Sequence, residues 1–194
     1  MKKGTKVKDL FQKEINENKA IACKFNNEIK SLDYKIMSGG KIELLNIEDK
    51  DGMSNSWYYL ALKGELEFAR ILNKTDDIQL IEGMMSRMKT AFNKRFWTGK
   101  EYRSPNYKGE TDDRGQALAV LAGFAIPEQY PLVLEVLKKE RHASPYMEKY
   151  VGEALFVMGY PKVALQRTRE RFADMVNYPD CTTLWEAGHL GEYV

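Results

Sequence analysis

The stretch "DDIQLIEGMMSRMKTAFNKRFW", residues 76–97, decides the fold class of this chain. Its apolar residues recur at every third or fourth position, starting with Ile81 and Met84, as they do on one face of an α-helix. The first turn carries two aspartates and the last turn carries Lys94 and Arg95, which is the charge order that the helix dipole favours. The stretch therefore predicts a long amphipathic helix, and we interpret its methionines as core filling instead of a cofactor site.

The same periodicity continues from residue 57 onward and predicts an all-α fold of antiparallel helical hairpins. Helical patterns with a charged outer face, at 76–97, 127–141 and 161–176, alternate with patterns that are richer in alanine and aliphatic residues. Each pattern of the second kind begins with a polar and aromatic cluster. These clusters are "MSNSWYY" (53–59), "ETDDRGQ" (110–116), "ASPYMEKY" (143–150) and, at the end, "CTTLWEAG" (181–188).

The alternation indicates inner and outer helices of stacked hairpins. If the inner helices run parallel, the four clusters meet at one end of the bundle and form a cleft. The competing interpretation is that each cluster is only a helix cap, because Ser, Thr, Asp and Asn are preferred there. Capping does not call for aromatic residues at the same positions, so we favour the cleft.

Residues 1–50 are expected to form a separate N-terminal helix and loop, ahead of a helical domain at 51–194. The apolar spacing over 7–29 is compatible with one amphipathic helix. Any β-structure is expected only at 34–52, as a short hairpin around the pair Gly39-Gly40 or as a long loop.

The composition excludes several classes of protein. With 194 residues, 43% of them hydrophobic, and a net charge of +2, the chain reads as an ordinary globular protein and not as a nucleic-acid binder or a membrane-surface protein. No apolar run approaches the roughly 20 residues that span a bilayer, and no signal peptide is visible. A cytoplasmic location is expected if the chain is complete, and a periplasmic or extracellular one if it is cut from a longer exported enzyme.

Cysteine and histidine are too few to predict a metal site. Cys23 and Cys181 could form one disulfide or none, and His142 and His189 are far apart in the sequence. We therefore expect no metal, no cofactor and no histidine-based nucleophilic triad. Any chemistry must come from carboxylates, arginines and aromatic residues.

Four ordered strings carry a family resemblance. They are "NSWYYLALKGELEFARILNKTDDIQLIEGMMSRMKTAFNKRFW" (55–97), "TDDRGQALAVLAG" (111–123), "ASPYMEKYVGEALFVMGYPKVALQRTRERFADMV" (143–176) and "TTLWE" (182–186). Together they resemble the C-terminal portion of the catalytic domain of bacterial α-L-rhamnosidases, glycoside hydrolase family 78. The resemblance covers about residues 51–186. It implies an (α/α)6 toroid of six hairpins, a pocket at the N-terminal ends of the inner helices, and a rhamnoside-like carbohydrate as ligand.

The resemblance also implies roles for individual residues. Family members hydrolyse terminal α-L-rhamnosyl linkages with inversion, for which a general acid and a general base lie roughly 6.5–9.5 Å apart. Glu186 matches the general base. Residues at the rim positions where the family holds its sugar are Trp57, Asp112, Asp113, Arg114, Tyr146, Glu148 and Trp185.

The chain departs from this family in two respects. Residues 1–50 contain nothing that resembles the segment with the general acid, and four inner-helix starts are found instead of six. We therefore expect a partial toroid, a poor or inactive rhamnosidase by itself, whose open edges favour self-association. The alternative is a tetratricopeptide-like binding module, since "TDDRG" and "SPYME" begin about 33 residues apart.

Overall fold

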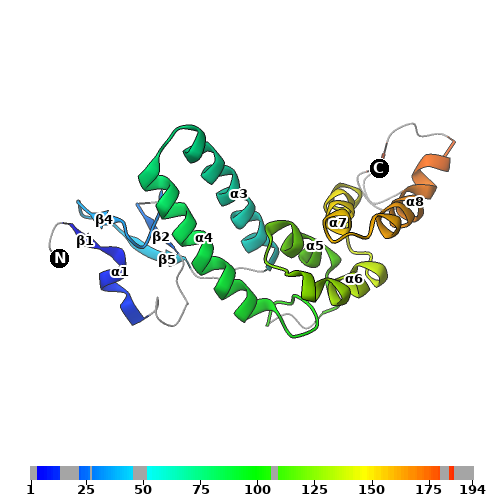
Figure 1. Ribbon diagram of the computed structural model, residues 1–194, viewed down its shortest axis with the longest axis horizontal. Helices are drawn as coiled ribbons and strands as arrows, with labels where there is room; N and C mark the ends of the chain where they lie inside the picture. The colour runs from blue at the N-terminus through cyan, green and yellow to red at the C-terminus, as the bar shows by residue number, and fades with distance from the viewer. Residues whose placement is uncertain are drawn as a thin grey trace. The chain divides into compact units, whose positions relative to one another are not determined.

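The computed structural model of the protein describes residues 4–13, 22–26, 28–45, 52–105, 109–179 and 184–185 (Figure 1). The chain divides into two compact units, Met1–Phe96 and Trp97–Val194. The first unit holds a small β-region and one helical hairpin, and the second holds two helical hairpins. The predicted boundary between 1–50 and 51–194 remains a prediction.

The β-region of the first unit consists of two small antiparallel sheets. In one sheet β1 pairs with β4, and in the other β2 lies between β3 and β5. The buried side chains of Val7, Cys23, Phe25, Leu32 and Ile36 form their common core. The elements are β1 (Thr5–Lys6), α1 (Val7–Leu10), β2 (Ala22–Phe25), β3 (Glu28–Lys30), β4 (Lys35–Ile36) and β5 (Ile42–Leu45).

The sequence prediction for this region was wrong. Among the described residues of 7–29, only α1 and residues 12–13 are helical, and the strands are not confined to 34–52. Cys23 and Phe25 are 0% and 4% exposed, so alternate residues of β2 face the core, which is the period of a strand and not of a helix. The hairpin around Gly39-Gly40 is not formed either, because β4 and β5 pair with different strands. The alternative of one long loop does not hold either, because β4 and β5 both lie within this segment.

The helical hairpin of the first unit pairs α3 (Gly52–Ile71) with α4 (Thr75–Phe96). The predicted helix at 76–97 is confirmed as α4, with its acidic first turn and basic last turn. Its apolar face is buried as the spacing requires, and Met88 and Phe92 are almost completely inaccessible to solvent. The methionines that are buried here contribute to the core, as expected.

The second unit is built from two successive hairpins. Inner helix α5 (Asp113–Ala122) packs against α7 (Pro145–Val157), and both pack against an outer helix of their own. The outer helices are α6 (Tyr130–Lys139), preceded by the 3-10 turn η2 (Pro127–Gln129), and α8 (Pro161–Asn177). The chain is thus predominantly helical, and the all-α prediction is confirmed.

Local sequence explains where these helices begin and end. Proline occupies the first turn of α6, α7 and α8, where its missing N–H costs no hydrogen bond. Gly123 follows α5 with a φ of 82°, and Gly159 follows α7 with a φ of 85°, in the left-handed region that glycine adopts readily. No helix in the described part of the chain is long and apolar enough to cross a membrane.

Candidate functional site

A cluster of buried charges joins the helices of the second unit. Asp113 is the first residue of α5, Glu148 lies in the first turn of α7, and Arg167 lies in the middle of α8. Their exposed fractions are 0%, 6% and 3%. Charged side chains are almost never buried to this degree unless they are paired. We refer to these three residues as the Arg167 cluster.

Every N–H donor of the Arg167 side chain forms a hydrogen bond. Its Nε donates to Glu148 Oε2 at 2.8 Å, and its Nη2 donates to Glu148 Oε1 at 2.8 Å and to Asp113 Oδ2 at 2.5 Å. Its Nη1 donates to the carbonyl oxygens of Leu137 and Glu140 near the end of α6. Burial alone would lower the pKa of Arg167, but the hydrogen bonds and charges of Glu148 and Asp113 outweigh it and raise that pKa. One side chain therefore connects the four helices α5, α6, α7 and α8.

A second arginine completes the environment of Glu148. Arg171, one turn further along α8, donates from Nε to Glu148 Oε1 at 2.8 Å and from Nη2 to the Ala143 carbonyl oxygen at 2.6 Å. Glu148 thus accepts three N–H bonds from two guanidinium groups, which fixes its position. Asp113 differs, because its Oδ1 is buried and accepts no hydrogen bond from any described residue.

The start of α5 carries a pair of the helix-capping type. Asp112 is the N-cap, and its Oδ1 accepts from the backbone N–H of Arg114 at 2.9 Å. The Arg114 side chain folds back onto the same carboxylate, with Nη2 2.5 Å from Oδ2. Burial would raise the pKa of Asp112, but its hydrogen bonds with Arg114 and the charge of that residue lower it. For Asp112 the capping interpretation is correct.

A pocket of about 510 Å³ lies beside this cluster, along α7 and α8. Tyr146, Glu148 and Trp185 line it, together with Phe156 and Phe172. The ring of Trp185 meets that of Tyr178 edge-on at 5.7 Å, and its buried Nε1 has no hydrogen-bond partner in the described part of the chain. The Tyr146 hydroxyl lies 3.1 Å from that of Tyr150. We call this cavity the aromatic pocket.

Comparison with known proteins supports the fold. No protein-family model matches the chain, and no curated protein matches it in sequence. Among the solved structures that match is a GH78-family rhamnosidase of Bacillus sp. GL1, with 23% sequence identity and a TM-score of 0.60. The match covers 71% of this chain and 16% of that protein. The chain shares the fold of this rhamnosidase over the matched part.

The structure places the predicted site residues in different surroundings. Tyr146, Glu148 and Trp185 line one pocket, and Asp113 is joined to Glu148 through Arg167. Asp112 and Arg114 pair with each other at the start of α5, as described above. The predicted general base, Glu186, lies outside the described residues.

Trp57 belongs to the other unit, where it lies on α3 with 38% of its surface exposed. Its contribution to the cleft therefore stays a prediction. Asp113 is completely inaccessible to solvent, which is unexpected for a residue predicted to touch a sugar.

Sequence reasoning missed Arg167 and Arg171. They belong to the stretch "QRTRERF" (166–172), which was interpreted as part of a charged outer face. Their spacing of four residues places both on the same side of α8, and Glu148 lies in the first turn of the preceding helix. That spacing opposite an acidic helix start is a sequence signal for an ion pair with Glu148, but it does not report that Arg167 is buried.

Within the described residues, one surface group could hold a metal ion. Glu110, Glu140 and His142 each offer one ligand atom, and these atoms lie within 4.8 Å of one another. His142 Nε2 already lies 3.3 Å from Glu140 and 3.6 Å from Glu110, and the Lys139 ammonium lies 2.8 Å from Glu140. These contacts account for the cluster as a surface ion-pair group, so we assign it no metal.

Proposed function

We propose that this chain is a glycoside hydrolase-related domain whose aromatic pocket binds a rhamnoside-like sugar. The observation that carries the proposal is that Tyr146, Glu148 and Trp185, which the resemblance implies as sugar contacts, line the same pocket. The fold shared with a rhamnosidase supports it.

The chemistry of the pocket suits a sugar. Aromatic side chains such as Tyr146 and Trp185 offer apolar faces to sugar C–H groups, and Trp185 Nε1 is a donor that has no partner in the described part of the chain. Two arginines hold the carboxylate of Glu148 in place, and a carboxylate can accept a further hydrogen bond from a sugar hydroxyl. A volume of about 510 Å³ lies within the range of small-molecule sites.

We propose Glu186 as the general base of an inverting hydrolysis and Asp113 as a residue that positions Glu148 through Arg167. Asp112, Arg114 and Trp57 remain candidates for the rim of the site. No general acid is identifiable, and such an acid contributes typically 10²- to 10⁴-fold to the rate. We therefore expect binding of the sugar with little or no hydrolysis by this chain.

Calorimetric titration with methyl α-L-rhamnoside tests the binding. We expect Trp185→Ala to weaken binding about tenfold, because the variant loses the apolar face of the indole ring that the sugar would cover. Leu165→Ala is the matched control, since Leu165 is 54% exposed on α8 and does not line the pocket. Equal binding by both variants would show that the sugar lies elsewhere. Binding of peptides from a library, without binding of the sugar, would favour the tetratricopeptide-like alternative. The comparisons do not support that alternative.

Hydrolysis of an aryl α-L-rhamnoside, with Glu186→Gln as control, tests the catalytic part. Little or no turnover is the expected result. Robust turnover that Glu186→Gln abolishes would contradict the expected lack of an acid and would confirm the base.

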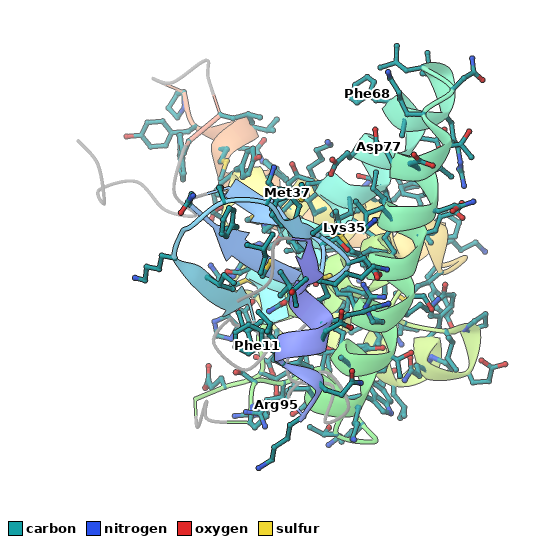
Figure 2. The ribbon with its side chains drawn as sticks, turned by 90° about the vertical axis from the view of Figure 1, so that its left-hand side faces the viewer. Phe11, Lys35, Met37, Phe68, Asp77 and Arg95 are labelled. Atoms are coloured by element: carbon teal, nitrogen blue, oxygen red, sulfur yellow. The ribbon has the colours of Figure 1, made fainter. Side chains whose placement is uncertain are left out.

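Exposed apolar residues support the further proposal of self-association. Phe68, Ile71 and Leu72 at the end of α3 are between 65% and 71% exposed, and Phe68 is labelled near the top of Figure 2. Exposed apolar side chains of this kind mark contact surfaces when they are contiguous. Sedimentation of wild type and of Phe68→Ser, Ile71→Ser is the test, and a monomer at all concentrations would contradict the proposal.

A further inference from the structure

One glycine inside a helix lies in the wall of the aromatic pocket. Gly152 belongs to the middle of α7 and lines the pocket together with Glu148 and Phe156. Residues four positions apart lie on the same face of a helix, so these three residues form one row with Gly152 at its centre. The Cβ of any other residue at position 152 would therefore project from the face of α7 that borders the pocket.

The fold itself does not require a glycine at this position. α7 continues through Gly152, which is not one of the described glycines with a positive φ. A Cβ there would have no atom of another described helix within 4 Å, so close helix packing does not exclude a side chain. Because glycine inside a helix is less favourable than alanine, Gly152 lowers the stability of α7 without a structural reason.

The position of Glu148 shows what the open space over Gly152 is suited for. Glu148 is 6% exposed and is held by Arg167 and Arg171, so its carboxylate marks a fixed point at one end of the row. One turn of helix rises about 5.4 Å, which is close to the width of a sugar ring. The space between Glu148 and Phe156 thus has room for one ring that lies along α7.

We propose that Gly152 is a ligand-contacting residue of the aromatic pocket, whose missing side chain leaves the space that the sugar ring occupies. This inference rests on the proposed sugar binding and adds the place of the ring within the pocket. One hydroxyl of the sugar donates to Glu148, and the C–H face of the ring packs on the backbone of α7 at Gly152, with Phe156 on its far side. A side chain at position 152 takes the place of the ring, so binding weakens as that side chain becomes larger.

Calorimetric titration of Gly152→Ala and Gly152→Leu with methyl α-L-rhamnoside tests the proposal, together with thermal melts of the same proteins. We expect Gly152→Ala to weaken binding at least about tenfold and Gly152→Leu to abolish measurable binding, because the added groups overlap with the ring. The melting temperature of Gly152→Ala should rise by about 1–4 °C, because alanine is the better helix former. A variant that is more stable and yet binds more weakly has lost a contact with the ligand and not its fold.

Gly64→Ala and Gly64→Leu are the matched controls. Gly64 also lies inside a helix, α3, and has open space where its Cβ would be, but it belongs to the other unit and does not line the pocket. Both controls should bind the sugar like wild type, and Gly64→Ala should also melt at a higher temperature.

Several outcomes would overturn the inference. Equal binding by Gly152→Ala and wild type would show that the ring lies away from Gly152, and the proposed sugar site would still stand. Equal weakening by the Gly64 variants would show that the effect is not local, and a lower melting temperature of Gly152→Ala would show that the fold requires the glycine. Absence of binding by wild type would contradict the proposed function together with this inference.

Discussion

Replacing Arg167 by methionine leaves two buried carboxylates without their shared partner. Asp113 is completely buried and loses its only side-chain hydrogen-bond donor in the described chain, whereas Glu148 keeps Arg171. Breaking a buried ion pair from one side typically costs about 3–5 kcal/mol. We expect the free energy of unfolding to fall by that amount, and the melting temperature by roughly 6–20 °C.

Denaturant unfolding followed by circular dichroism measures this loss, with Arg169→Met as the matched control. Arg169 lies two residues away on α8, is exposed, and should tolerate the change within about 0.5 kcal/mol. The triple variant Asp113→Asn, Glu148→Gln, Arg167→Met removes the charges together and should recover part of the loss. If Arg167→Met lowered the free energy of unfolding by less than about 1 kcal/mol, as the control does, the inference that the cluster excludes water and is tightly paired would be refuted.

Three other predictions follow from individual residues. Asp112→Ala should destabilise the second unit by about 1 kcal/mol, while Asp112→Asn keeps the cap. The pKa of Asp112 is lowered in the folded state, so its carboxylate adds stability that Asp112→Asn lacks. Wild type should therefore be more stable than Asp112→Asn above pH 3.8 and lose this difference as the pH falls further below it. Thermal melts at several pH values measure the difference. Tyr58 has its pKa raised from 10.0 to about 12, so the unfolded chain loses this proton first and stability should fall between these pH values, less steeply in Tyr58→Phe. Gly159→Ala should lower the free energy of unfolding by about 1 kcal/mol, because the φ of Gly159 is 85°. Gly64→Ala should raise it by about 0.5–1 kcal/mol, because Gly64 lies within α3 and a Cβ there meets open space. Denaturant unfolding distinguishes the two opposite changes.

The helices could be predicted from the sequence because their signals are local. The apolar spacing of 76–97 and the prolines of the outer helices lie within each element, and α4, α6 and α8 occur close to the predicted bounds. The strands could not be predicted in the same way. β2 has only four residues, too few for its alternation to outweigh a helical spacing that runs through 7–29.

The candidate site was predictable only in part. Polar and aromatic residues at predicted helix starts placed Glu148, Tyr146 and Trp185 at one rim, and the three line one pocket in the structure. Their role as sugar contacts stays a prediction. The sequence could not indicate that Arg167 is buried, because its neighbours on α8 are exposed and charged. Arg167 is buried because it pairs with Glu148, which is 19 residues away in the sequence, and with Asp113, which is 54 residues away. No local sequence pattern reports partners at such separations.

The Arg167 cluster also has a consequence for how the helices find their correct alignment. Apolar faces of stacked hairpins resemble one another, so burial alone would tolerate α8 sliding along α7 by one turn. A slip of one turn toward the C-terminal end of α8 brings Val163 into the place of Arg167, moves the guanidinium by about 5.4 Å and leaves the buried carboxylate of Asp113 without a donor. Arg167 thereby makes this misaligned packing less stable than the native one, although the apolar residues alone would pack in either alignment.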